Sequence, residues 1–321
     1  MIWILLACQT ATQNGEPTEE HTEALKADTE DVTALLARIE RLETEIERIQ
    51  SSNALVGKII VDEAGDVVIV GANLRIIQDL DDNTVSNGKG NLILGHFNEA
   101  NVDGTHNLVM GSGHQISGEG HIVSGNNHII NGYHSAAISG DHNELEGDYL
   151  STLSGQDNTI IANYSSITGG GENLVENDHS SIAGGFQNEA NGTYSTIAGG
   201  FANKVSGHTA SVAGGGTNRA TAPGALAVGG FGNVAAGNSS VVLGGGYSQA
   251  TGNYNSVVVG GYMNLSEGQW STVIGGDANT ASGIGATTVG GQKNWTAGDY
   301  ATVLGGYETY TSDAHSIAPN Q

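Results

Sequence analysis

A glycine recurs every fifteen residues along much of this 321-residue chain. The series runs from Gly125 to Gly245 and, after one step of sixteen, from Gly261 to Gly306. Gly95 and Gly111 extend it upstream less regularly, which gives about fifteen units. Self-similarity at a fixed short period indicates a repeat protein, in which each unit packs mainly against its two neighbours.

Each unit is predicted to contain two short strands and two turns. The regular units carry Ser or Thr, two apolar residues, Gly-Gly, and an Asn three residues after the second glycine, as in residues 181–192. The apolar segments are rich in β-branched residues and too short for helices. The paired glycines supply the positive φ of a sharp turn, and the Asn is expected to adopt the left-handed region in that turn. A second glycine seven residues after the first, such as Gly192, is expected to form the opposite corner. The repeat therefore predicts a mainly β fold, a parallel β-solenoid of about 15-residue coils stacked roughly 4.8 Å apart.

Both faces of the first strand carry apolar residues. Leu226 and Val228 point to one side, and Ala227 between them points to the other. A coil only two strands wide holds a single thin core, so the second apolar face needs another cover. Association between chains provides that cover and predicts an oligomer.

Residues 25–56 show the apolar period of a coiled coil. Leu25, Val32, Ile39, Ile46 and Asn53 fall at heptad position a, Leu35, Leu42, Ile49 and Val56 fall at d, and Asp28 is the clear exception. The segment Arg38-Ile39-Glu40-Arg41-Leu42-Glu43 matches a short pattern of three-stranded coiled coils, in which the arginine reaches the glutamate of a neighbouring helix. An ordinary surface ion pair is the alternative. We predict a trimeric stalk with these trimerisation residues: Arg38, Ile39, Leu42, Glu43, Ile46 and Ile49.

Residues of about 90–313 resemble the head of trimeric autotransporter adhesins. The resemblance rests on strands followed by Gly-Gly, such as those at 225–230, 240–245 and 256–261. It implies a left-handed parallel β-roll assembled as a homotrimer and acting as a surface adhesin. Two features differ from that family, because the stalk precedes the head and the C-terminus lacks a membrane anchor of amphipathic strands. Phage tail fibres with similar trimeric β-rolls remain a structural relative.

The N-terminal segment Leu5-Leu6-Ala7-Cys8 resembles the lipobox of bacterial lipoproteins. This resemblance implies lipidation of Cys8 and attachment to the bacterial outer membrane, at the cell surface. The segment lacks a preceding Lys or Arg and is short for a signal peptide, so a cytosolic protein with an apolar leader is the alternative. The predicted organisation is a lipobox at 1–8, a flexible tether at 9–24, a coiled-coil stalk at 25–56, a β-rich neck at 57–90 and a β-roll head at 91–321.

The acidic balance excludes several classes of partner. Ten basic against 34 acidic residues give a net charge of −24, which repels nucleic acid and anionic lipid headgroups. The single cysteine excludes an internal disulfide and a multi-cysteine metal cluster. We predict no nucleic-acid partner and no cofactor.

Histidines concentrate in the first coils of the repeat. His114, His128 and His142 lie 14 residues apart on one predicted corner, and His106, His121 and His134 lie on the other. Stacked imidazoles are candidates for a weak Zn²⁺ or Ni²⁺ site or for a pH switch. Because no carboxylate recurs in register with them, the sequence favours solvated or inter-chain hydrogen-bonding ladders over metal binding.

Aromatic residues also recur in register. Tyr149, Tyr164 and Tyr194 share a corner, and His179 fills the missing step. Such a row could stack on sugar rings, although packing over neighbouring coils or at a trimer seam is the alternative. The candidate ligand contacts are Tyr149, Tyr164 and Tyr194, with Tyr254, Trp270 and Tyr300 predicted in the same column.

The sequence contains no recognisable catalytic motif. Carboxylates are scattered rather than paired, and there is no nucleophile elbow, zinc-protease motif or phosphate-binding loop. We predict a non-enzymatic, surface-exposed trimeric fibre that binds a glycan or protein of another cell. A tailspike-like glycan depolymerase and a purely structural spacer are the alternatives.

Overall fold

The computed structural model describes residues 19–52, 59–61, 67–69, 90–95 and 101–318. The chain separates into two units, residues 1–75 and 76–321. The lipobox with Cys8, the end of the predicted stalk at 53–56 and most of the predicted neck lie outside the described residues.

The first unit contains a helix and a strand pair. Helix α2 (Glu19–Ser52) begins six residues before the predicted start of the stalk, so the predicted tether is helical from Glu19 onward. Strand β1 (Ile59–Val61) pairs antiparallel with β2 (Val67–Ile69). Among the described helices, none is both long and apolar enough to span a membrane.

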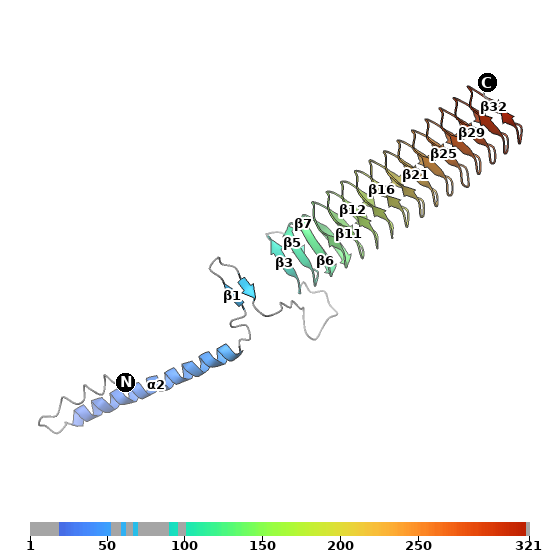
Figure 1. The fold of residues 1–321 in the computed structure, drawn as a ribbon. Helices are drawn as coiled ribbons and strands as arrows, with labels where there is room; N and C mark the ends of the chain where they lie inside the picture. Colours follow the sequence, from blue (N-terminus) through green and yellow to red (C-terminus); the bar gives the residue numbers. More distant parts are fainter. Residues whose placement is uncertain (1–18, 53–58, 62–66, 70–89, 96–100, 319–321) are drawn as a thin grey trace. The chain divides into compact units, whose positions relative to one another are not determined.

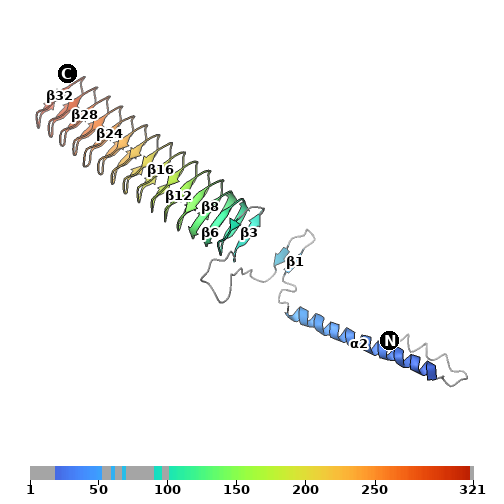
Figure 2. The ribbon, with the colours of Figure 1, turned by 180° about the vertical axis from the view of Figure 1, so that it is seen from behind.

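The second unit is a solenoid of two parallel sheets, which face each other across a thin core (Figures 1 and 2). Successive strands alternate between the sheets, so one contains the sixteen odd-numbered strands from β3 on and the other the fifteen even-numbered strands from β4 on. We call them the odd sheet and the even sheet. About fifteen turns of chain result, as the repeat predicted.

The odd sheet consists of β3 (Leu92–Gly95), β5 (Leu108–Ser112), β7 (Ile122–Asn126), β9 (Ala136–Ala137), β11 (Ser151–Thr152), β13 (Ser166–Ile167), β15 (Ser181–Ile182), β17 (Thr196–Ile197), β19 (Ser211–Val212), β21 (Leu226–Val228), β23 (Val241–Leu243), β25 (Val257–Val259), β27 (Thr272–Ile274), β29 (Thr287–Val289), β31 (Thr302–Leu304) and β33 (Ile317–Ala318). The even sheet consists of β4 (Asn101–Val102), β6 (Gln115–Glu119), β8 (Ile129–Tyr133), β10 (Glu144–Glu146), β12 (Thr159–Ile161), β14 (Leu174–Val175), β16 (Glu189–Ala190), β18 (Lys204–Val205), β20 (Arg219–Ala220), β22 (Val234–Ala235), β24 (Gln249–Ala250), β26 (Leu265–Ser266), β28 (Thr280–Ala281), β30 (Trp295–Thr296) and β32 (Tyr310–Thr311).

The register places like residues above one another. Ser181 pairs with Thr196 and Ile182 with Ile197, one fifteen-residue coil later. The core is formed by the second residue of each strand, such as Ile182 in the odd sheet and Ala190 in the even sheet, and both side chains are fully buried. Each coil has room for few inward side chains, which explains why small and β-branched residues fill the interior.

The turn chemistry differs from the prediction at two positions. The repeated Asn does not adopt the left-handed region: the preceding residue does, as at Gln187 with φ 56°, and Asn188 turns inward and is buried. At the opposite corner the left-handed residue is Tyr194, with φ 59°. Gly192 is needed for a different reason, since a Cβ there would overlap the carbonyl oxygen of Gly207 in the next coil. Gly185, in contrast, has the predicted positive φ, at 94°.

Candidate functional site

The predicted aromatic row is present as a stacked column at one corner of the roll. The rings of Tyr149, Tyr164, His179 and Tyr194 follow one another with centroid separations of 5.0, 5.1 and 4.7 Å and interplanar angles of 8° or less. His134 extends the column at 5.4 Å from Tyr149. The separations match the strand spacing because each ring belongs to the left-handed residue of its coil.

This stacking changes what the column offers to a ligand. Tyr164 has one ring face against Tyr149 and the other against His179, although about half of the residue is exposed. A sugar that stacks on an aromatic side chain needs a free ring face. The column therefore presents ring edges and phenol hydroxyls, and the predicted mode of sugar stacking is not open to its inner members.

The C-terminal members of the predicted column are only partly in register. Trp270 and Tyr300 occupy the left-handed corner position, separated by Gly285. Tyr254 does not, because the sixteen-residue coil between Ser239 and Asn255 shifts it by one position: it pairs with Asn238, and Asn255 takes the left-handed place. The assignment of Tyr254 to this column was wrong, since one extra residue in a coil displaces the residues beside it.

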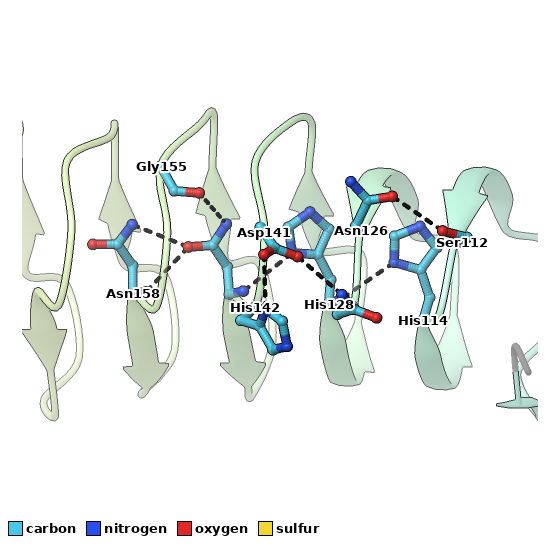
Figure 3. A network of polar contacts seen from close by, with 10 residues as sticks. Ser112, His114, Asn126, His128, Asp141, His142, Gly155 and Asn158 are labelled. Atoms are coloured by element: carbon cyan, nitrogen blue, oxygen red, sulfur yellow. Dashed lines mark hydrogen bonds and ion pairs between the residues drawn. The ribbon is translucent and has the colours of Figure 1, made fainter.

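The histidines of the first coils are divided between the interior and the surface. His114 and His128 are buried in one row, with ring centroids 5.3 Å apart, and this row continues as the Asn row at Asn143 and Asn158 (Figure 3). His142 lies one position earlier, exposed and left-handed, with Nδ1 2.9 Å from an oxygen of Asp141. The prediction that His142 shares a corner with His114 and His128 was therefore wrong. His121 is likewise buried, whereas His106 and His134 are left-handed corner residues.

Both ring nitrogens of the buried histidines bind the backbone. The amide of His128 donates to Nδ1 of His114 at 3.2 Å, and the amide of Asn143 donates to Nδ1 of His128 at 3.1 Å. Nε2 of His114 lies 3.1 Å from the carbonyl oxygen of Met110, and Nε2 of His128 lies 3.0 Å from that of Ser124. Because a carbonyl only accepts, each Nε2 carries the proton and each ring is neutral. The rings therefore have no free lone pair for a metal ion. A second proton on Nδ1 would face the N–H of the backbone amide that now donates to it, so the folded protein disfavours protonation of these rings.

We expect acid to loosen this end of the roll. Burial lowers the pKa of His114, His121 and His128 below the ordinary 6.5, with the neighbouring His114 adding to the effect on His128. These rings are neutral when folded and gain protons on unfolding, so their contribution to stability is complete above about pH 6.5 and is lost as the pH falls toward their lowered pKa values. In that window each loses about 1.4 kcal/mol per pH unit. Hydrogen exchange of the amides in residues 108–135 would measure the loss.

The matched variant replaces His114 and His128 by Asn, the residue that continues the same row. It should abolish most of the acid sensitivity, whereas His142→Asn at the exposed position should leave it intact. An unchanged pH profile in the double variant would contradict this assignment.

The outer face of the odd sheet is uncharged along the solenoid, with large apolar side chains in the coils up to β11 and from β21 on, and Ser, Thr and Ala in those from β13 to β19. It consists of the first residue of each odd strand and the residue two positions later, and no charged residue occupies either position from Leu92 to Ile317. Large members such as Leu153, Leu243 and Leu304 are 39–49% exposed. We call this surface the odd face. Charged side chains occur instead at the equivalent outward positions of the even sheet, for example Glu144 and Glu267.

A polar groove runs along the edge of the even sheet. One wall is formed by the left-handed residues of four successive coils, of which Ala202 and Thr217 have the smallest side chains. The other wall is formed by the first residues of β14, β16, β18 and β20. The groove has a volume of about 630 Å³, within the range of small-ligand sites. Lys204 and Arg219 lie side by side on its second wall. The sequence prediction missed both residues, although two basic residues one coil apart are rare in this chain.

The predicted trimerisation residues all lie on α2. Arg38, Ile39, Leu42, Glu43, Ile46 and Ile49 are exposed in the single chain. The apolar members of the set are about half exposed, and Arg48 with Glu45 forms an ion pair within the helix at 2.6 Å.

Comparison with known protein families agrees with this architecture. A family model described as grass antifreeze beta roll matches residues 66–162. The chain is a β-roll repeat protein. The matched stretch extends through the histidine-rich coils to β12, and the similarity concerns that part of the chain alone. A comparison with curated proteins finds no match.

Proposed function

We propose that this protein is a non-enzymatic surface fibre of three identical chains, whose head binds a glycan or a protein of another cell. In this proposal the roll is left-handed, α2 packs with two copies of itself, and a lipid on Cys8 holds the fibre at the bacterial outer membrane. The observation that carries the proposal is the odd face.

The odd face supports association between chains because it carries no charged side chain, whereas the rest of the roll is acidic. Residues 91–321 contain 17 acidic side chains, yet none of them occupies this face. Sixteen strands at a spacing of roughly 4.8 Å give a strip about 70 Å long. A strip of this length is far larger than the single apolar side chains that are scattered over ordinary protein surfaces. Exposed apolar stretches as long as those at its two ends mark protein contacts in soluble proteins.

A second copy of the same chain is the occupant that fits best. The face repeats along the roll with the period of the coils, so an identical copy matches it in length and spacing. Helix α2 leaves its own apolar row exposed, from Val32 to Ile49, as expected of a helix that needs helical partners. The Arg38 to Glu43 pattern favours three strands.

The mass of the full chain in solution tests this proposal. We expect light scattering to give about three times the chain mass of 32.8 kDa. A monomer would overturn the fibre, because the odd face and the apolar row of α2 would then both remain in water. Adherence of the trimer to cells or immobilised glycans, measured against a buffer surface, tests the binding function.

Antifreeze activity is a second candidate, favoured by the description of the matching family. The odd face carries Thr272, Thr287 and Thr302 in one row, next to the apolar row that includes Ile274. Ice binding and trimerisation would use this same face. A monomer that arrests ice growth would therefore support the second candidate, whereas a trimer without that effect would support the first.

A further inference from the structure

The groove on the even sheet has one end in a stretch of chain without acidic residues, and its other end is lined by Glu172 and Glu189. Between Glu189 and Glu267 no Asp or Glu occurs, although the net charge of the chain is −24. Lys204 and Arg219 both lie in this stretch, and residues 91–321 contain only one other basic residue, Lys293. The Arg219 end of the groove is therefore the part of the head where an anionic ligand meets the least repulsion.

The two basic side chains differ in their surroundings. Lys204 forms an ion pair with Glu189 of the preceding coil. Arg219 is exposed, and its guanidinium group has no hydrogen bond or ion pair to any of the described residues, although its backbone amide donates to the carbonyl oxygen of Asn233. A guanidinium group without a carboxylate partner has its planar set of donors available for a carboxylate of another molecule.

The first wall of the groove keeps these groups accessible. The left-handed corner residue of each coil is often large, as at Tyr247 and Met263, but it is Ala202 beside Lys204 and Thr217 beside Arg219. At the other end of the groove, the side-chain amide of Gln187 donates to a carboxylate oxygen of Glu172 at 2.7 Å. The groove thus combines a cationic end with an end rich in hydrogen-bond acceptors, which suits sugar hydroxyls.

We propose that this groove binds an acidic oligosaccharide, with the carboxylate of one sugar on Arg219 and Lys204 and the neighbouring hydroxyl groups on Gln187 and Glu172. The inference rests on the proposed function and names the ligand class and site of the head. The even sheet lies across the core from the odd face, so the groove stays open when the odd face is covered by other copies.

Trigalacturonic acid and its methyl ester are suitable probes, because esterification removes the charge of each carboxyl group and adds only a methyl group. With the full chain, we expect calorimetry to detect binding of the acid and at least tenfold weaker binding of the ester. Arg219→Gln should weaken binding of the acid by at least about tenfold, the size expected for a charged hydrogen bond. Raising the ionic strength should also weaken it.

Lys293→Gln is the matched control, because it removes the other basic residue of the head, which lies 3.6 Å from Glu308 outside the groove. It should bind the acid as the unaltered chain does. Equal affinity for acid and ester, or unchanged affinity in Arg219→Gln, would overturn the groove as a carboxylate site.

A triple variant of Tyr149, Tyr164 and Tyr194 to Ala separates the two surfaces. If it loses glycan binding while Arg219→Gln retains it, the aromatic column is the site and the groove proposal is wrong. A chain that adheres to cells but does not bind trigalacturonic acid also overturns the groove, and leaves the proposed function standing. A chain that binds neither overturns both.

Discussion

Replacing Leu243 and Ile274 by Glu is expected to lower the melting temperature of the roll by about 10 °C or more and to reduce its mass in solution. Both side chains lie on the odd face and are about two-fifths exposed in the single chain, so the substitutions do not disturb the interior of a monomer. In a trimer joined through this face they would bury six carboxylates without partners, and each uncompensated buried charge costs several kcal/mol. Circular dichroism and light scattering would measure the two effects.

The control places the same two charges on the even sheet. Gln249→Glu and Thr280→Glu alter outward residues of β24 and β28, in nearby coils. This variant should keep the mass and melting behaviour of the unaltered chain. If the two double variants behave alike, the odd face is not the contact between chains.

Asn188→Asp is expected to destabilise the roll by roughly 3–5 kcal/mol, the range seen when a buried charge has no partner. The Asn188 amide nitrogen donates to the carbonyl oxygens of Gly184 and Gly200, at 3.1 and 3.0 Å, and its side-chain oxygen accepts the amide of Asn203 at 3.1 Å. A carboxylate would replace the donor by an oxygen that faces two carbonyls. Because each coil packs only on its neighbours, urea unfolding should also split into two transitions.

Ser206→Glu is the natural control, since it adds the same charge at an exposed position of the next coil. We expect it to unfold within about 0.5 kcal/mol of the unaltered chain, as surface substitutions usually do. Equal stability of the two variants would show that the buried Asn row does not hold the coils together.

The period of the repeat made the architecture predictable. Strands as short as Ser181–Ile182 have no individual signal, but fifteen copies of the same alternation fix their number, their parallel pairing and the inward position of Ile182. The stacking of Tyr149, Tyr164, His179 and Tyr194 followed from the same register. The sequence also predicted the second apolar face, as the positions of Leu226 and Val228 on either side of the buried Ala227 confirm.

Features that depend on one position within a turn were not predictable in this way. Asn and its preceding residue are both common in turns, so the spacing alone could not show that Gln187 takes the left-handed conformation and Asn188 the interior. The same shift by one residue separates His142 from His128 and Tyr254 from Trp270. The groove depends on two small corner residues, Ala202 and Thr217, that lie next to two basic residues of the even sheet. A search for catalytic motifs does not detect this combination, because the residues belong to different coils.

The left-handed corners have a consequence for how such a chain diversifies. Twice in most coils a side chain leaves the roll at a backbone position with φ near 55°, and residues as different as Tyr194, Ala202 and Lys293 occupy it. The interior rows and the hydrogen bonds between coils hold this conformation, whatever side chain it carries. Substitutions at the corners can therefore accumulate without refolding the rod. The roll separates the residues that build it from those that it displays, so descendants of one gene could acquire new binding partners by exchanging corner residues alone.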